Sequence, residues 1–224
     1  LVEGALLMRT PDDIHTLYKE RRDAAGAMWA RLDEIRQAYN GDLVVALPGL
    51  SKSERPAVAN LLQSGIDQTA RRIASTDPEA IFTPDRAGQA ALDRAHLKRD
   101  VVRGWWHRND MPKKRGRRAR HLIAYATTPV TIVPDHDAQP LWLLRDPLNT
   151  WPAPCPDPDD IVPPDVVCSY KRTAKWLARC WPEQYARLSK REASQAFLCL
   201  EYLDAYERVL IVCGDATNDY EAPM

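Results

Sequence analysis

"TTPVTIVPDHDAQPLWLLRDP", from Thr127 to Pro147, is the stretch at which the character of the chain changes. Two short apolar segments rich in β-branched and aromatic residues flank a polar turn at residues 135–137, which predicts two strands joined by a hairpin. The chain before Thr127 has the apolar spacing of helices, and most of the chain after Pro147 has strand patterns. Helices followed by antiparallel strands predict an α+β fold, with a helical part at 1–126 and a β-rich part at 127–224.

Four helices are expected in the N-terminal part. The first begins at the cap Thr10, with Pro11 in its first turn and Asp13 in the capping-box position, and it ends at Asn40-Gly41. Apolar residues at spacings of three and four predict three more helices, at about 54–75, 86–107 and 112–126.

The C-terminal part is expected to be mainly extended. Proline makes "NTWPAPCPDPDDIVPPD" extended and mostly non-helical. "VVCSYKRTAKWLARCW" is interpreted as one strand or a pair of strands, followed by a short helix at "PEQYARLS". "AFLCLEYLDAYERVLIVCG" predicts a hairpin that turns near Asp204 and Ala205.

The composition indicates a globular protein rather than a disordered one. Of 224 residues, 45% are hydrophobic and 28% are charged, close to globular averages. Basic and acidic residues both number 31, so no net charge favours DNA or anionic lipid. No apolar run approaches the ~20 residues that cross a bilayer. The five cysteines contain no CxxC pair, which favours free thiols in a reducing compartment over a zinc site or disulfides.

The charges are nevertheless distributed unevenly along the chain. From Arg94 to Arg120 there are eleven Lys or Arg residues against two Asp. From Thr128 to Tyr170 there are seven Asp residues, one Arg and ten of the eighteen prolines. Such asymmetry indicates either nucleic-acid contact by the basic part or pairing of the two parts, within one subunit or between neighbours.

The densest basic segment is the expected helix at 112–121, and three roles stay open for it. It would bind phosphates without regard to sequence, form a subunit interface, or lie solvated. The preceding Trp105 and Trp106 would stack on bases in the first role, or fill a core. We expect the helix to be exposed at its basic start and anchored by its apolar end. Its candidate interface or DNA-facing residues are Lys113, Lys114, Arg115, Arg117, Arg118 and Arg120.

No enzymatic signature is present in the sequence. The P-loop, dinucleotide-binding, zinc-protease and nucleophile-elbow motifs are all missing. His136 lies between two aspartates, and Asp157, Asp159 and Asp160 are close in sequence, but neither group has the ligand spacing of a known metal loop. We therefore expect no catalytic residues, no cofactor and no metal; an enzyme would need a metal at one of these two groups.

Three segments resemble the portal proteins of tailed bacteriophages, particularly those that infect actinobacteria. They are "ERPAVANLLQSGIDQTARRIAST" (54–76), "RRARHLIAYATTPVTIVPD" (117–135) and "LWLLRDPLNTWPAP" (141–154). The hairpin segment "EYLDAYERVLIVCG" (201–214) also fits the position of a strand pair in that family. The pieces occur in the family's order along most of the chain.

The resemblance implies a structural subunit of a homo-oligomeric ring, commonly a dodecamer, at one vertex of the virion capsid. Double-stranded DNA passes through such a ring during DNA packaging and genome ejection. The implied partners are other copies of the chain, the major capsid protein, the terminase, the head-tail connector or adaptor, and that DNA, with no membrane. Assembly would take place in the host cytoplasm.

The chain departs from the family in length. Portal proteins are about twice as long, and the portal-like match covers the wing, with no counterpart of the stem or clip. We therefore interpret the sequence as an N-terminal or wing portion, either a fragment of a longer protein or a shortened relative. The alternative function is a protein that binds nucleic acid without sequence preference through the helix at 112–121.

Overall fold

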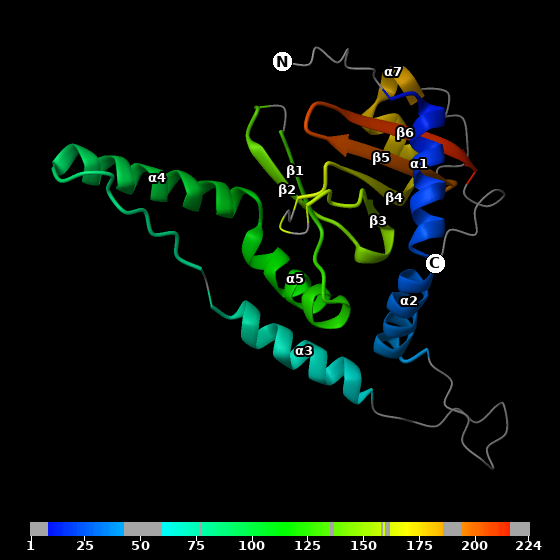
Figure 1. Cartoon of the computed structure of the whole chain (residues 1–224), viewed down its shortest axis with the longest axis horizontal. Coiled ribbons are helices and arrows are strands. Elements are labelled where there is room, and N and C mark those ends of the chain that lie inside the picture. The colour runs from blue at the N-terminus through cyan, green and yellow to red at the C-terminus, as the bar shows by residue number, and fades with distance from the viewer. Residues whose placement is uncertain are drawn as a thin grey trace. The chain divides into compact units, whose positions relative to one another are not determined.

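The structure is a computed structural model that describes residues 9–42, 60–76, 78–134, 137–157, 159, 162–185 and 194–215. Helices come first and antiparallel strands follow, so the α+β prediction is confirmed (Figure 1). The helices are α1 (Pro11–Ala24), α2 (Gly26–Asn40), α3 (Leu61–Ala74), α4 (Gln89–Arg108), α5 (Met111–Tyr125), α6 (Ala174–Cys180), α7 (Pro182–Tyr185) and the 3-10 turn η1 (Pro147–Asn149). The strands are β1 (Val130–Pro134), β2 (Pro140–Leu144), β3 (Thr150–Pro152), β4 (Asp165–Thr173), β5 (Ala196–Asp204) and β6 (Arg208–Asp215).

The chain forms two compact units. Their boundaries differ from the division at residue 126 that the sequence suggests. Unit 1 combines residues 1–28 with 149–224, and unit 2 is the continuous stretch 29–148. The difference arises because helix α1 packs on the strands of the C-terminal part, while the β1–β2 hairpin packs with the helices that precede it. Unit 2 is therefore inserted in the sequence between the two segments of unit 1.

Unit 1 is built on a four-stranded antiparallel sheet of order β3-β4-β5-β6. Seven consecutive residues of β5, from Phe197 to Leu203, are buried, as expected for a central strand covered on both faces. Helix α1 contributes Ile14 and Tyr18 to the core, and the Tyr18 ring meets the Trp151 ring edge to face at 5.9 Å. Arg21 forms an ion pair of 2.5 Å with Asp165 at the start of β4.

A second cluster in unit 1 involves helix α6. Ala174 and Leu177 pack with Phe197 and Cys199 of β5. The prediction of a strand, or a pair of strands, over "VVCSYKRTAKWLARCW" is wrong for the second half of this segment. The strand β4 ends at Thr173, whose hydroxyl accepts a hydrogen bond from the Trp176 backbone N–H and so caps a helix.

The prediction of a single helix between Thr10 and Asn40 is also wrong, because this segment forms two helices. The capping box at Thr10 is present, with its hydroxyl and the Asp13 carboxylate each accepting a backbone N–H. Helix α1 then ends at Ala24 and α2 begins at Gly26. Glycine is a poor helix former, which makes this a favourable position for the interruption.

Unit 2 contains α3, α4, α5 and the β1–β2 hairpin. Asn109, which ends α4 and is 2% exposed, connects the helices to the hairpin. Its amide donates to the backbone oxygens of Trp105 and Pro140, both at 3.0 Å, and its side-chain oxygen accepts from the Trp142 backbone N–H at 2.7 Å. The Trp105 indole donates to the Pro140 oxygen and meets the Trp142 ring edge to face at 5.5 Å. Trp105 therefore packs within unit 2.

The two predicted hairpins are confirmed. Strands β1 and β2 pair antiparallel, with Val130 opposite Leu144. Strands β5 and β6 pair antiparallel as well, and their turn is held by Asp204, whose carboxylate accepts the backbone N–H groups of Tyr206 and Glu207 at 2.7 Å. Aspartate is favoured at such a turn because its side chain satisfies backbone donors.

Candidate functional site

The basic segment lies on helix α5 of unit 2, as expected, and the helix is anchored at more positions than its apolar end. Met111 in the first turn is fully buried, and Ala119 is 6% exposed. In the apolar end that was expected to anchor the helix, Leu122 is 49% exposed, whereas Ile123 and Tyr125 are partly buried. The helix is thus held along its length, and its basic start is not simply exposed.

Two of the basic residues pack against the hairpin strand β2. The Lys114 ammonium donates to the Trp142 backbone oxygen at 2.6 Å. Burial lowers the pKa of Lys114, and the nearby Asp110 carboxylate partly opposes that change. The Arg118 guanidinium lies 5.2 Å from the centre of the Trp142 ring, a cation–π contact. Both side chains therefore support the internal packing of unit 2.

Two further basic residues connect α5 to the region of α3. Arg115 donates to the backbone oxygen of Thr76, just beyond the end of α3. Arg120 pairs with Asp67 of α3 at 3.5 Å, and the Tyr39 hydroxyl donates to the same carboxylate at 2.9 Å. The Asp67 carboxylate partly compensates the charge of Arg120, whereas the Thr76 oxygen only positions Arg115.

The remaining two candidates are the most accessible. Lys113 has a side chain that is 81% exposed, and its ammonium meets the Asp110 carboxylate at 3.1 Å. Arg117 is exposed on the same helix. Together with burial, which has the larger effect, its positive charge lowers the pKa of His121. Five of the six predicted site residues thus contact groups of this chain, which weakens the case for α5 as a binding surface.

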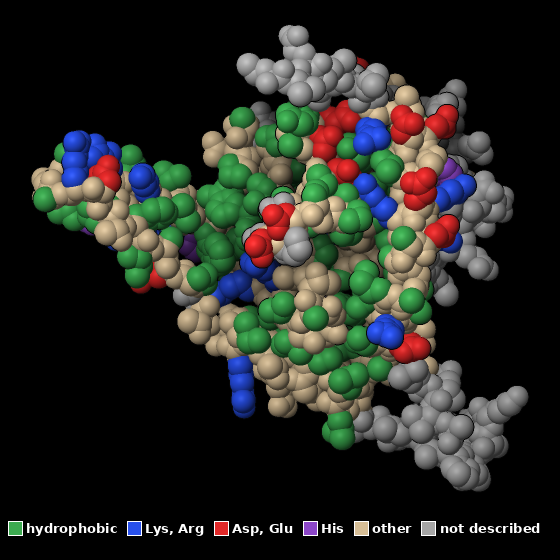
Figure 2. Space-filling model, viewed as in Figure 1, with side chains coloured by type: hydrophobic (Ala, Val, Ile, Leu, Met, Phe, Trp, Pro, Cys, Tyr) green, Lys and Arg blue, Asp and Glu red, His purple; other side chains and the backbone are tan. Residues whose placement is uncertain are grey.

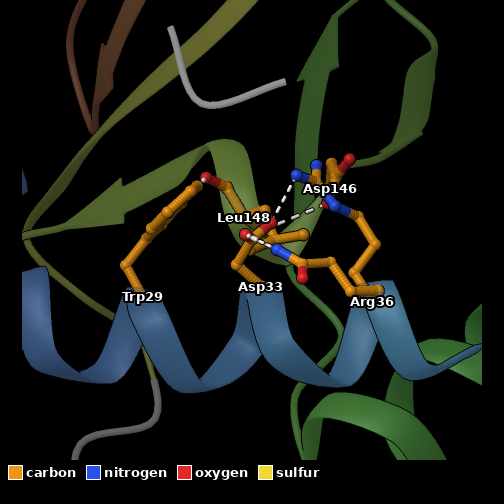
Figure 3. A network of polar contacts seen from close by, with 6 residues as sticks. Trp29, Asp33, Arg36, Asp146 and Leu148 are labelled. Atoms are coloured by element: carbon orange, nitrogen blue, oxygen red, sulfur yellow. Dashed lines mark hydrogen bonds and ion pairs between the residues drawn. The ribbon is translucent and has the colours of Figure 1, made fainter. Parts of the chain in front are cut away.

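A polar network beside α5 was not anticipated as a site. The Trp29 indole of α2 donates to the Leu148 backbone oxygen at 2.9 Å, and Asp33 holds Arg36 and Gln37 of the same helix (Figure 3). The Asp146 carboxylate accepts the Leu148 backbone N–H at 3.1 Å and so shapes the turn after β2. The Trp29–Leu148 contact connects α2 to the turn at 146–148, and the other contacts order the helix and the turn separately, so the network has a structural role.

Helix α4 carries a surface that the sequence patterns alone did not identify. Leu97 is 65% exposed and Val101 is 62% exposed, whereas Ala91 and Ala95 of the same helix are buried. Hydrophobic and basic side chains occur together on this helix (Figure 2). The spacing of Leu97 and Val101, four residues apart and off the buried stripe of α4, is the signal that would have revealed it.

The five free thiols differ in exposure. Cys155 and Cys180 are exposed, Cys168 and Cys199 are buried, and Cys213 is intermediate. Burial raises the pKa of Cys199 to about 12. The thiolate is the reactive form, so this thiol is protected both by exclusion of reagent and by its pKa.

A labelling experiment tests this division. At pH 8, a maleimide should modify Cys155 and Cys180 within minutes, while Cys168 and Cys199 should react at least a hundredfold more slowly until urea unfolds unit 1. Peptide mass spectrometry would assign each site. Rapid modification of Cys199 in the folded protein would contradict the buried position of this thiol.

The two groups considered for a metal are only partly described. His136 and Asp160 lie outside the described residues. Asp157 accepts the Asp159 backbone N–H at 3.0 Å, which is a turn contact. Within the described ranges, no group of three His, Cys, Asp or Glu side chains is placed to hold a metal ion.

No helix in the described part of the chain is both long and apolar enough to span a bilayer. Neither a protein-family model nor a curated protein matches this chain.

Proposed function

We propose that this chain is the N-terminal, wing portion of a ring-forming portal subunit of a tailed bacteriophage. In this role it would build the capsid-vertex conduit for double-stranded DNA, and the ring would present docking sites for the terminase and the head-tail connector. The basis in sequence is the resemblance of the segments at 54–76, 117–135 and 141–154 to that family. The α+β fold is compatible with a wing.

The observation that supports this proposal most is the outward surface of helix α4. Leu97 and Val101 are both more than 60% exposed on one side of a 20-residue helix. Burying one such side chain in a partner contributes about 1.5–3 kcal/mol, so a surface of this kind favours association with protein. A subunit that is completed by its neighbours explains it better than an isolated domain does.

The alternative, sequence-independent binding of nucleic acid through 112–121, has less support. Lys114, Arg115, Arg118 and Arg120 contact the hairpin or the region of α3, which leaves Lys113 and Arg117 as the most accessible charges. Binding through two phosphate contacts would be weak at physiological salt, since affinity rises with the number of phosphates neutralised.

The native mass of the purified chain tests the proposal. Light scattering or mass photometry at low and high salt should find one large closed species, near twelve subunits, whose subunits separate as salt rises. In parallel, the affinity for a 30-base-pair DNA duplex should be measured across the same salt range. A monomer at all concentrations that binds the duplex tightly and with strong salt dependence would replace the portal proposal with the nucleic-acid alternative.

A further inference from the structure

The outward surface of helix α4 consists of two parallel ridges. Leu97 and Val101 are four residues apart and form an apolar ridge along the helix. Arg94 and Lys98 are also four residues apart, and each lies three residues before its apolar neighbour, so they form a basic ridge directly beside the first. A partner for this surface needs apolar and acidic groups close together.

The basic ridge retains its capacity to bind a partner. Arg94 meets Asp85 at 3.3 Å, but both side chains are about half exposed or more, and such surface pairs contribute little. Within the described ranges no ion pair involves Lys98. On the other side of the apolar ridge lie two carboxylates: Asp93 accepts from Gln89, and Asp100 meets Arg99 at 3.3 Å in a similarly exposed pair.

A segment with the complementary chemistry belongs to unit 1 of the same sequence. Between β3 and β4, Asp157 and Asp159 are exposed, and Val162 is 75% exposed. Prolines 152, 154, 156, 163 and 164 flank these residues. Proline restricts the backbone before binding, which reduces the entropy that is lost when an extended segment docks.

We propose that the two ridges of α4 bind the segment around Asp157, Asp159 and Val162 of a second copy of this chain. Arg94 and Lys98 pair with the carboxylates, and Leu97 and Val101 cover the valine. The two surfaces differ, so each copy offers one of each and the contact is head to tail. Repetition of such a contact closes a ring or extends a filament. This inference rests on the proposed function. It places the subunit interface on α4, whereas the sequence patterns had suggested α5.

Charge reversal on α4 provides the first test. Arg94→Glu with Lys98→Glu should raise the dissociation constant of the assembly at least tenfold in 100 mM salt, because like charges then face each other. The matched control is Arg99→Glu with Arg103→Glu, which makes the same change in charge on the opposite side of the same helix. The control should change the constant by less than about threefold. Equal effects of the two pairs would overturn the proposal.

A compensating change of charge at Asp157 and Asp159 should restore assembly of the Arg94→Glu, Lys98→Glu chain. Asp157→Asn keeps the side-chain oxygen that accepts the Asp159 backbone N–H, and Asp159→Lys introduces a positive charge. This pair alone should weaken association, and in the Arg94→Glu, Lys98→Glu chain it should recover most of the lost affinity. If the combined variant is weaker than either parent, the two surfaces do not meet.

Crosslinking distinguishes contact between copies from contact within one copy. Cys155 is exposed and lies two residues before Asp157, so it provides a natural probe. In a Cys180→Ser, Cys213→Ser background, one chain carries Arg94→Cys and Cys155→Ser, and the other keeps Cys155. A short bis-maleimide should produce covalent pairs that join residue 94 to Cys155 when the chains are mixed, and none when Val101→Asp is added to the first chain.

The outcomes separate this inference from the proposed function. A ring that forms normally and ignores the α4 reversals overturns the inference and leaves the portal proposal standing. A chain that carries Arg94→Cys and keeps Cys155 provides a further check. If it crosslinks only within one copy at every concentration, the inference is overturned. A monomer without crosslinks overturns both.

Discussion

Replacing Trp151 with alanine should destabilise unit 1 by about 4 kcal/mol, the largest single effect that we expect. Trp151 is 3% exposed, meets Tyr18 of α1 edge to face, and donates from its indole to the Ser169 hydroxyl at 3.2 Å. Its removal leaves a large cavity between α1 and the sheet. Urea unfolding followed by circular dichroism measures the free energy.

Hydrogen exchange would show where the effect falls. Backbone amides of α1 and β3 should lose protection in Trp151→Ala, while α3 and α5 of unit 2 should keep theirs. Ser169→Ala is the matched control, since it removes only the hydrogen bond and should cost about 1 kcal/mol. A similar loss in both variants, or a loss of protection that begins in α5, would contradict this role of Trp151 in the core.

Asn109→Ala should destabilise unit 2 by about 3 kcal/mol. The substitution removes three hydrogen bonds, takes the side-chain partner from the backbone N–H of Trp142, and leaves the oxygen of Pro140 with the Trp105 indole alone. Buried polar groups that lose a partner carry a desolvation cost of about 1–3 kcal/mol each. Thermal unfolding, with hydrogen exchange at β1 and β2, measures the result.

Asn109→Asp separates the two directions of hydrogen bonding. It keeps an acceptor for the Trp142 N–H but loses both donor contacts, and it places a charge at a buried position. We expect it to be at least as destabilising as alanine. A stability equal to that of the unmodified protein would mean that the side chain of Asn109 does not connect α4 to the hairpin.

The local patterns were sufficient to predict most of the elements. The alternation around Val130 and Leu144 and the Asp204 turn carry their own short-range signals, so both hairpins are confirmed. The break between α1 and α2 was missed because a single glycine such as Gly26 is often tolerated inside a helix. The helix α6 was missed because its cap, Thr173, is also a favourable strand residue.

The candidate site was harder to predict, because its decisive contacts are distant in sequence. Lys114 and Arg118 meet Trp142, and Arg120 meets Asp67, which lies 53 residues earlier. No local pattern indicates that most of a dense basic segment already contacts other parts of its own fold. The apolar ridge of α4 is a different case, because the spacing of four between Leu97 and Val101 is visible in the sequence. The sequence does not show that Ala91 and Ala95 are the buried residues of the helix and that this pair is exposed.

The discontinuity of unit 1 has a consequence for how the chain is made. On the ribosome, α1 emerges early with Ile14 and Tyr18, but the β5 strand it packs against follows more than 170 residues later. At 5–20 residues per second, that interval is roughly 9–35 s. Unit 2 is complete well before then and can fold first, so the nascent chain exposes the apolar face of α1, which a chaperone would have to shield until β5 has emerged.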